Sequence, residues 1–268
     1  MDIVLIAIVG MLVGGAVNAL ADELPAGRFP RPPRNEDGSR RPVYAWLGVT
    51  ALLFEVWQAK PPHSKLSWRY PLTELTLAGL MAITQFVTGD DASLPSGQRL
   101  IWQAYAVIFV LLAVVDLERR QILIKPVMFA AALAVVDAAV FPQSPPNLAS
   151  ALVGGLCGGA TFSLIYLGGR LFDGLVKRVA TPVFGLGDVY LMGLAGLILG
   201  FPNILVAIVL AIALAGAGAA VYLALTRLRK RRYKRFTALP YAPYILMATT
   251  LVLLFQGEIS HVVFGLQM

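Results

Sequence analysis

The sequence predicts an all-α membrane protein with about eight transmembrane helices. Of its 268 residues, 58% are hydrophobic and only 14% are charged, which is far more apolar than an average soluble domain. The apolar residues fall into segments close to the roughly 20 residues that a helix needs to cross a bilayer. The Lys and Arg residues gather in the segments that would lie on one side of the membrane, as the positive-inside rule expects.

Eight apolar segments are candidate spans, although the sixth and the last are short for a bilayer. The first begins after Asp2 and has no preceding basic region, so it is predicted to be a retained helix, even though Ala19-Leu20-Ala21 resembles a signal-peptidase site. In chain order, the candidate spans are 3–20, 71–88, 100–116, 123–141, 149–168, 188–201, 203–226 and 241–256.

The charged residues predict the orientation of these spans. With eight spans, one side holds all of the 22 Lys and Arg residues except Arg99. Such a bias marks the cytoplasmic side of a membrane, so both termini are expected outside. The loops on the basic side are 21–70, 117–122, 169–187 and 227–240, with Lys125 just inside the fourth span.

The roughly 50-residue loop 21–70 contains an apolar segment, 43–59, that carries Glu55. If this segment crossed the membrane, every later loop would change sides and the charge bias would disappear. It is therefore predicted to be interfacial or re-entrant. The chain then divides into a first transmembrane helix (1–20), a cytoplasmic lobe (21–70) and a membrane domain with seven helices (71–268).

Composition excludes several classes of function. The net charge of +7 is accounted for by loop topology, so no nucleic-acid partner is expected, and the basic run 226–236 is predicted to touch anionic lipids. Cys157 is the single cysteine, which excludes an internal disulfide and a cysteine-based zinc site. The glycine clusters 154–159 and 215–220 are predicted to let helices approach closely.

Two carboxylates stand at the same predicted membrane level. Asp116 ends the third span, which leaves toward the cytoplasm, and Asp188 opens the sixth, which enters from it. An aspartyl protease needs such a pair in order to activate a water molecule. Two alternatives remain open: Asp188 is the N-cap of a helix after Gly187, and Asp116 forms a surface salt bridge with Arg119 or Arg120.

The other polar candidates favour structural roles. Asp137, inside the fourth span, is interpreted as a satisfied polar contact or a structural partner, and Glu74 as the anchor of a cytoplasmic polar network. His63 and His261 fall in loops, so a Ser–His intramembrane protease has no support. The sequence contains no HExxH motif for zinc hydrolysis either.

Five segments carry a family resemblance. They are "VGGAVNALADELP" (13–25), "SWRYPLTEL" (67–75), "VVDLERRQIL" (114–123), "GLGD" (185–188) and "LPYAPYI" (239–245). In this order they resemble the prepilin peptidases, or type IV leader peptidases, which are membrane aspartyl proteases of the GxGD class. The resemblance covers nearly the whole chain and implies that Asp116 and Asp188 are the catalytic pair.

The resemblance implies an endopeptidase that removes the basic leader of type IV prepilins or pseudopilins on the cytoplasmic side, between a glycine and the following apolar helix. Gly185 and Gly187 would let the backbone approach an extended substrate strand. The remaining residues that the resemblance marks for substrate binding or structural support are Asn18, Arg69, Glu74, Pro240 and Pro243.

The sequence departs from the family pattern in the lobe. Many members hold zinc there with two CxxC pairs and also methylate the new N-terminus with S-adenosylmethionine. The interval 42–70 has no cysteine, so no zinc site is expected, and S-adenosylmethionine is a cofactor only if methylation is retained. Ile122-Leu123 replaces the usual Ile-Pro after the first aspartate, and Tyr190 stands where Lys is common.

Two alternatives to a peptidase stay open at this point. A transporter or channel would use Asp116, Asp137 and Asp188 as a proton or cation path. A catalytically degenerate assembly factor for a pilus or secretion machine would keep both aspartates. The expected partners are a prepilin or pseudopilin and the lipid bilayer, and the sequence does not predict an oligomeric state.

Overall fold

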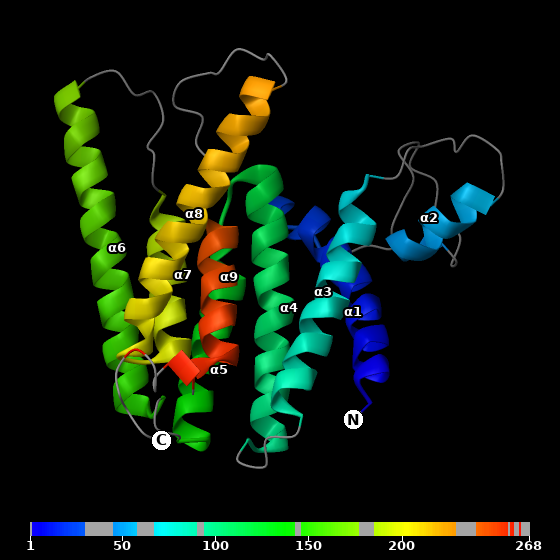
Figure 1. Ribbon diagram of the computed structural model, residues 1–268, viewed down its shortest axis with the longest axis horizontal. Helices are drawn as coiled ribbons and strands as arrows, with labels where there is room; N and C mark the ends of the chain where they lie inside the picture. Colours follow the sequence, from blue (N-terminus) through cyan, green and yellow to red (C-terminus); the bar gives the residue numbers. More distant parts are fainter. Residues whose placement is uncertain are drawn as a thin grey trace. The chain divides into compact units, whose positions relative to one another are not determined.

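A computed structural model describes residues 2–29, 45–57, 67–89, 94–142, 146–176, 185–228 and 240–256, together with 258, 259 and 263. Most of these residues are helical and none of them is in a strand (Figure 1), which confirms the all-α class for this part of the chain. The elements are α1 (Ile3–Glu23), the 3₁₀ turn η1 (Leu24–Ala26), α2 (Gly48–Trp57), α3 (Arg69–Thr88), α4 (Ser96–Arg119), α5 (Ile124–Val140), α6 (Leu148–Val176), α7 (Leu186–Leu199), α8 (Asn203–Leu228) and α9 (Ala242–Leu254).

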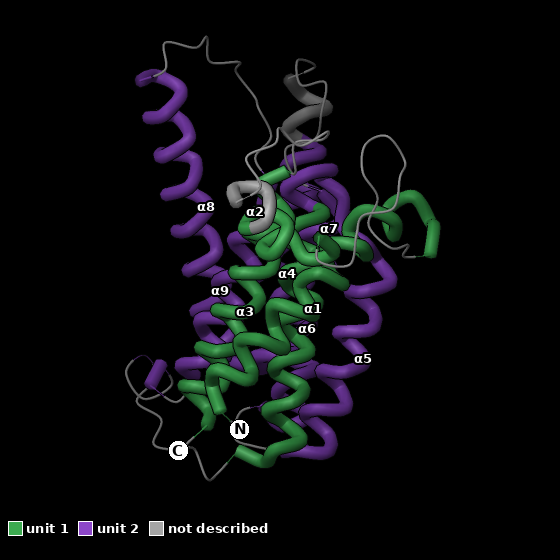
Figure 2. Tube along the Cα trace, turned by 90° about the vertical axis from the view of Figure 1, so that its right-hand side faces the viewer, with its two compact units in different colours: residues 1–115 green, residues 116–268 purple. Residues whose placement is uncertain are grey.

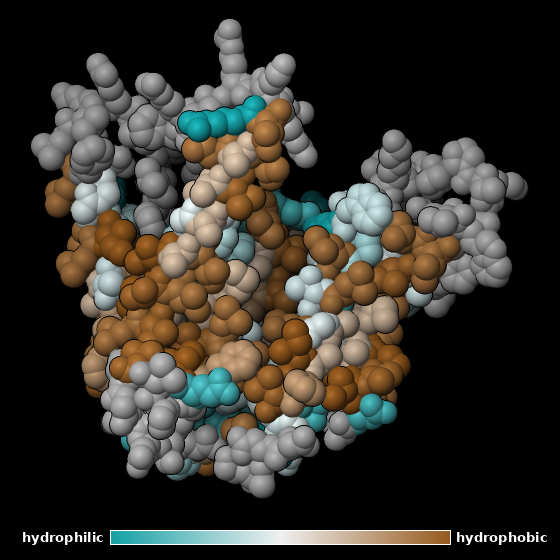
Figure 3. Space-filling model, in the orientation of Figure 1, coloured by the Kyte–Doolittle hydropathy of each residue, from teal (hydrophilic) through white to brown (hydrophobic). Residues whose placement is uncertain are grey.

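Within the described residues, four helices are long and apolar enough to cross a membrane: Ile3–Ala26, Ser96–Arg119, Leu148–Leu171 and Asn203–Leu228. Apolar side chains also dominate the face seen in Figure 3. At 14 and 13 residues, α7 and α9 are only about 20 Å long, less than a hydrocarbon core of about 30 Å. The chain is a membrane protein, and the eight crossings and their orientation stay predictions.

The chain forms two compact units, Met1–Val115 and Asp116–Met268 (Figure 2). Unit 1 contains α1, η1, α2, α3 and most of α4. Unit 2 begins in the last turn of α4 and contains α5 to α9. The predicted division into a first helix, a lobe and a membrane domain concerns topology and stays a prediction.

Unit 1 is built around the packing of α1 on α3. A Cβ atom at Gly10 would lie 2.8 Å from the Cα atom of Ala78, and one at Gly14 would lie 2.7 Å from the Cα atom of Glu74. Small residues allow such backbone contact between apolar helices. Two glycines in α1 therefore set the distance between these helices.

Glu74 joins α2 to this pair of helices. Its side chain is completely buried. Its Oε1 atom accepts hydrogen bonds from the backbone N–H of Gly48 at 2.7 Å and from Asn18 Nδ2 at 3.3 Å, and its Oε2 atom accepts from the N–H of Val49 at 2.9 Å. Because Gly48 and Val49 begin α2, a carboxyl group of α3 caps the α2 N-terminus. Glu74 thus anchors a polar network, and its predicted cytoplasmic location stays a prediction.

The same network connects the end of α1 to the start of α3 by a salt bridge and hydrogen bonds. Arg69 forms a salt bridge with Asp22 at 2.6 Å, and the Tyr70 hydroxyl donates to Asp22 at 2.9 Å. Asn18 also donates to the carbonyl of Tyr70 at 3.0 Å. The segment 43–59 contains α2, and its contact with the membrane stays a prediction.

Unit 2 is built around α7. Its packing neighbours are α5, α6, α8 and α9, and most of its residues from Leu191 to Leu199 are buried. A Cβ atom at Gly196 would overlap the backbone of Gly154, and one at Gly158 would overlap the carbonyl of Met192. The glycine cluster 154–159 thus permits close helix packing, as the sequence predicts.

Adding a methyl group to Gly196 tests this contact. Gly196→Ala places the Cβ atom inside the backbone of α6, so α6 and α7 must separate, and overpacking of this kind costs about 1–3 kcal/mol. We expect a lower thermal unfolding temperature for the purified protein in detergent. The matched control is Gly168→Ala, because a Cβ atom there meets nothing within 4 Å. Equal unfolding temperatures for the two variants would contradict the packing argument.

The Glu74 cap can be tested by a carboxyl-to-amide exchange. Glu74→Gln turns a donor group toward one of the N–H groups of Gly48 and Val49, and an unsatisfied buried donor costs about 1–3 kcal/mol. The control is Asp2→Asn, because Asp2 caps α1 by accepting from Val4 N–H at 3.0 Å in an exposed setting, where Asn caps equally well. Chemical denaturation should show a loss of stability for the first variant alone. A similar stability of both variants would mean that the α2 cap contributes nothing.

Candidate active site

Asp116 lies in the last turn of α4, and only 6% of it is exposed. The backbone N–H of Ala242 donates to its carboxyl group, and Arg120 is its nearby positive charge. Its Oδ2 atom is buried and makes no hydrogen bond within the described residues. The helix stops soon afterwards, because Arg120 takes a left-handed backbone conformation (φ 53°) and donates its N–H to the carbonyl of Asp116 at 2.8 Å. The carboxyl group therefore faces the start of α9.

Asp188 is the third residue of α7, which begins at Leu186. Its Oδ2 atom accepts from the N–H of Gly185 at 3.2 Å, and its own N–H donates to the carbonyl of Gly185 at 3.1 Å. The sequence suggested that Asp188 is itself the N-cap. That detail is wrong, because Gly185 is the N-cap, and Asp188 stabilises the first turn from inside it.

Both carboxyl groups belong to unit 2 and lie within electrostatic range of each other. Asp116 acts electrostatically on Asp188, so the two groups repel each other when both are charged. Asp188 likewise acts on Tyr241, which precedes α9. The end of α4 and the starts of α7 and α9 thus meet around the pair. Helix N-termini attract negative charge, which suits a site that holds two acids.

Gly187 brings the segment after Asp116 against α7. A Cβ atom at position 187 would lie 2.7 Å from the Cβ atom of Ile122. A Cβ atom at Gly185 would meet nothing closer than 3.8 Å, and Gly185 has an ordinary extended conformation with φ −96° and ψ 152°. Gly187 is therefore required by packing, whereas Gly185 leaves an open surface beside the Asp188 carboxyl group.

The start of α9 supplies residues that the sequence did not single out. Ala242 donates its backbone N–H to Asp116, and the Tyr241 ring packs against Phe162 at a centroid distance of 5.9 Å. Both follow Pro240, and Pro243 stands in the first turn of α9, where a missing N–H is tolerated. The segment "LPYAPYI" is part of the family resemblance, but its residue spacing does not indicate which of its groups faces an aspartate.

Three of the other predicted residues belong to unit 1, and Asp137 belongs to unit 2. Asn18, Arg69 and Glu74 form the polar network of unit 1, and their role in substrate binding stays a prediction. Asp137 is buried on α5, 13 residues beyond Ile124 and hence about 20 Å along the helix. Asp137 therefore lies near the opposite end of α5 from Ile124.

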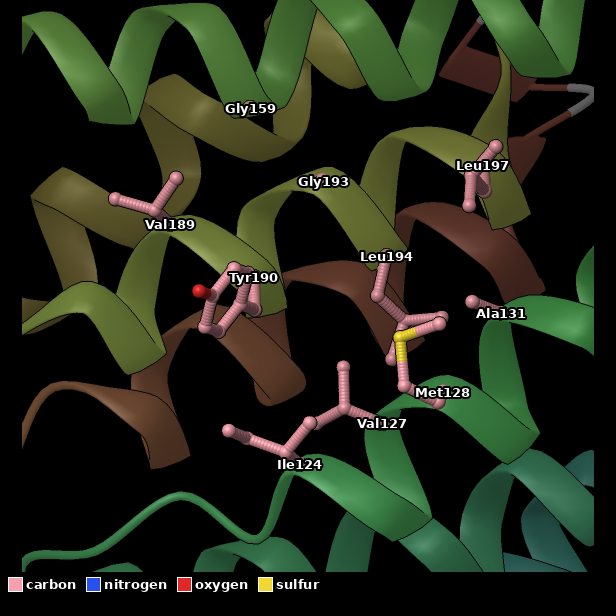
Figure 4. A pocket seen from close by; sticks show the side chains of 10 residues that line it. All are labelled: Ile124, Val127, Met128, Ala131, Gly159, Val189, Tyr190, Gly193, Leu194 and Leu197. Atoms are coloured by element: carbon pink, nitrogen blue, oxygen red, sulfur yellow. The ribbon is translucent and has the colours of Figure 1, made fainter.

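A cavity of about 390 Å³ lies between α5, α6 and α7 (Figure 4). It is lined by α5 side chains between Ile124 and Ala131, by α7 side chains between Val189 and Leu197, and by Gly159 of α6. The lining is apolar except for the Tyr190 hydroxyl group. Figure 4 shows the side chains of Met128 and Leu194 pointing toward one another across the space between α5 and α7.

One segment of this chain matches a known protein family. Residues 103–221 match the type IV leader peptidase family. The matched segment contains Asp116, Asp188 and the two glycines between Phe184 and Asp188, and it ends before Pro240. Comparison with the curated proteins and with the solved structures found no match. The chain is therefore a membrane protein whose segment 103–221 matches the type IV leader peptidase family, the family that its sequence resembles.

Proposed function

We propose that the protein is a membrane aspartyl endopeptidase that cleaves the leader from type IV prepilins or pseudopilins at the cytoplasmic membrane face, with Asp116 and Asp188 as its catalytic pair. The observation that carries the proposal is the meeting of these two carboxyl groups from the end of α4 and the start of α7. Both lie within the segment that matches the leader peptidase family, which supports a protease in general.

The proposed chemistry is general acid–base catalysis of peptide hydrolysis. One carboxylate takes a proton from water while the water oxygen bonds to the peptide carbonyl carbon, and the other carboxyl group protonates the departing amine as the C–N bond breaks. A pair of close carboxyl groups can share these roles, because their repulsion disfavours the doubly charged state. Because the two groups interact, they take up and release protons as a unit in this step.

The surroundings of Asp188 suit an extended peptide. Gly185 is exposed and lies one hydrogen bond away from the Asp188 carboxyl group. A backbone without a Cβ atom lets a substrate strand come close to the peptide plane. The start of α9 borders the site, because Ala242 donates its N–H to Asp116 and Tyr241 lies within electrostatic range of Asp188.

Replacing either aspartate tests the catalytic pair. Asp116→Asn and Asp188→Asn remove a proton carrier, so each should slow leader removal by about 100-fold or more. The assay is co-expression with candidate prepilins, followed by the size and N-terminal mass of the product. Asp2→Asn, an exposed helix cap in unit 1, should process normally.

Each outcome of this assay separates the candidate functions. Undiminished processing by both variants would rule out the pair. A wild-type protein that leaves every prepilin uncut would favour the degenerate assembly factor or the transporter. An added methyl group on the mature N-terminus would establish the second activity, for which S-adenosylmethionine is the expected donor.

A double substitution tests whether Gly187 positions the pair through Ile122. Gly187→Ala pushes the segment after Asp116 away from α7, and a misplacement of about 1 Å can cost a factor of about 100 in rate. Adding Ile122→Ala removes the overlapping atoms, so the double variant should cleave faster than Gly187→Ala alone. The control is Gly216→Ala, where a Cβ atom meets nothing within 4 Å. Strictly additive losses would show that the two positions act independently.

A further inference from the structure

The cavity between α5, α6 and α7 lies at the middle of the apolar span of α6. The residue of α6 that lines it is Gly159, which stands 11 residues after Leu148 and 12 before Leu171, the two ends of that span. Each end is therefore about 17 Å away along the helix. With α6 across a bilayer whose hydrocarbon core is about 30 Å thick, Gly159 lies near the centre of that core.

The cavity opens at a surface that faces lipid at this depth. Ile124, Met128 and Tyr190 at its rim are 59%, 62% and 47% exposed, whereas Val127 and Leu194 at its floor are 4% and 2% exposed. Of the most apolar stretch of the α6 span, only 22% is buried. An opening in such a surface is accessible from the hydrocarbon of the bilayer.

Two glycines of the lining leave room that helix packing does not need. A Cβ atom at Gly193 would meet nothing closer than 3.8 Å, and one at Gly159 nothing closer than 3.9 Å. Cβ atoms at Gly154 and Gly196, on the same two helices, would instead overlap with backbone atoms. The space at Gly159 and Gly193 therefore belongs to the cavity and not to the contact between α6 and α7 (Figure 4).

The lining does not suit water or an extended peptide. It carries no charge, and its one polar side-chain group is the Tyr190 hydroxyl, whereas a buried water molecule needs about two to four polar partners. An extended peptide would bring N–H and C=O groups without partners, and each of these is costly in hydrocarbon.

The cavity is also too small for a helical segment, which would satisfy its own backbone groups. The lining residues Val189 and Leu197 are about 12 Å apart along α7, and a helix about 10 Å in diameter fills about 900 Å³ over that length. This volume is more than twice the 390 Å³ of the cavity.

We infer that the cavity holds an acyl chain of a bilayer phospholipid. An apolar cavity of about 150 Å³ already holds benzene, so 390 Å³ accommodates a stretch of such a chain. The chain takes the place that side chains would fill at Gly159 and Gly193. Because the lining is uncharged, the site recognises the hydrocarbon and not the headgroup. The inference takes α6 as a membrane-crossing helix and does not rest on the proposed function.

Photolabelling from the lipid phase tests this site in the wild-type protein. The probe is a phosphatidylcholine with a diazirine in the middle of one acyl chain, in phosphatidylcholine vesicles, and mass spectrometry of peptides locates the adducts. We expect an adduct at Leu194, although only 2% of this residue is exposed. The matched control is Leu191, an equally buried leucine of α7 that does not line the cavity. Phe129, 64% exposed on α5, reports labelling by the surrounding lipid.

Filling the cavity gives a second measurement. Gly193→Leu places a side chain in the space of the acyl chain, so the Leu194 adduct should fall about tenfold or more while the Phe129 adduct is unchanged. Gly168→Leu, where a Cβ atom meets nothing within 4 Å, should leave both adducts unchanged. A phosphatidylglycerol probe with the same acyl chains should give the wild-type pattern.

Several results would overturn the inference: an adduct at Phe129 without one at Leu194, equal adducts at Leu191 and Leu194, or an unaltered Leu194 adduct in Gly193→Leu. Loss of the Leu194 adduct on addition of a prepilin would assign the cavity to a peptide instead. The comparison of Leu194 with Leu191 uses the wild-type protein, so it decides the inference even where Gly193→Leu does not fold. Prepilin cleavage is measured separately, so failure of the proposed function leaves the lipid site in place.

Discussion

The close contact between α6 and α7 decides where Asp188 lies. Gly154, Gly158 and Gly196 allow the two backbones to touch, and the other helices of unit 2 pack around α7. In a bilayer the lipid is as apolar as the helix surfaces, so association depends on close packing rather than on the hydrophobic effect. The first turn of α7, which carries Asp188, is thereby held in place by the packing of the rest of that helix on α6.

Unit 1 combines close glycine packing with a buried carboxyl group. Two glycines bring α1 onto α3, but α2 is attached through the carboxyl group of Glu74, which binds two backbone N–H groups at the start of that helix. A buried hydrogen-bonded group of this kind specifies one geometry, because any shift leaves a polar atom without a partner. Glycine packing thus fixes helix positions in both units, and in unit 1 a buried cap fixes the position of α2 as well.

The sequence predicted the helices well because hydropathy and length reflect the bilayer directly. It also brought Asp116 and Asp188 together, since charge bias placed their helix ends on one side. It did not predict that α7 begins at Leu186, because the bond between Asp188 and Gly185 is a local geometry that composition does not encode. The role of Ala242 was missed for another reason: it lies far from Asp116 along the chain, and only the packing of α9 on α7 brings its N–H group to the carboxyl group.

The contact between Ile122 and Gly187 links the two motifs that carry the aspartates. One residue fills the volume that the other leaves empty, so neither position can accept a larger side chain by itself. In the history of such a protein, these two positions are expected to vary together, with a bulkier residue at one accompanied by a smaller residue at the other. The first motif and the second motif are in this sense a single inherited unit, although α5 and α6 separate them in the sequence.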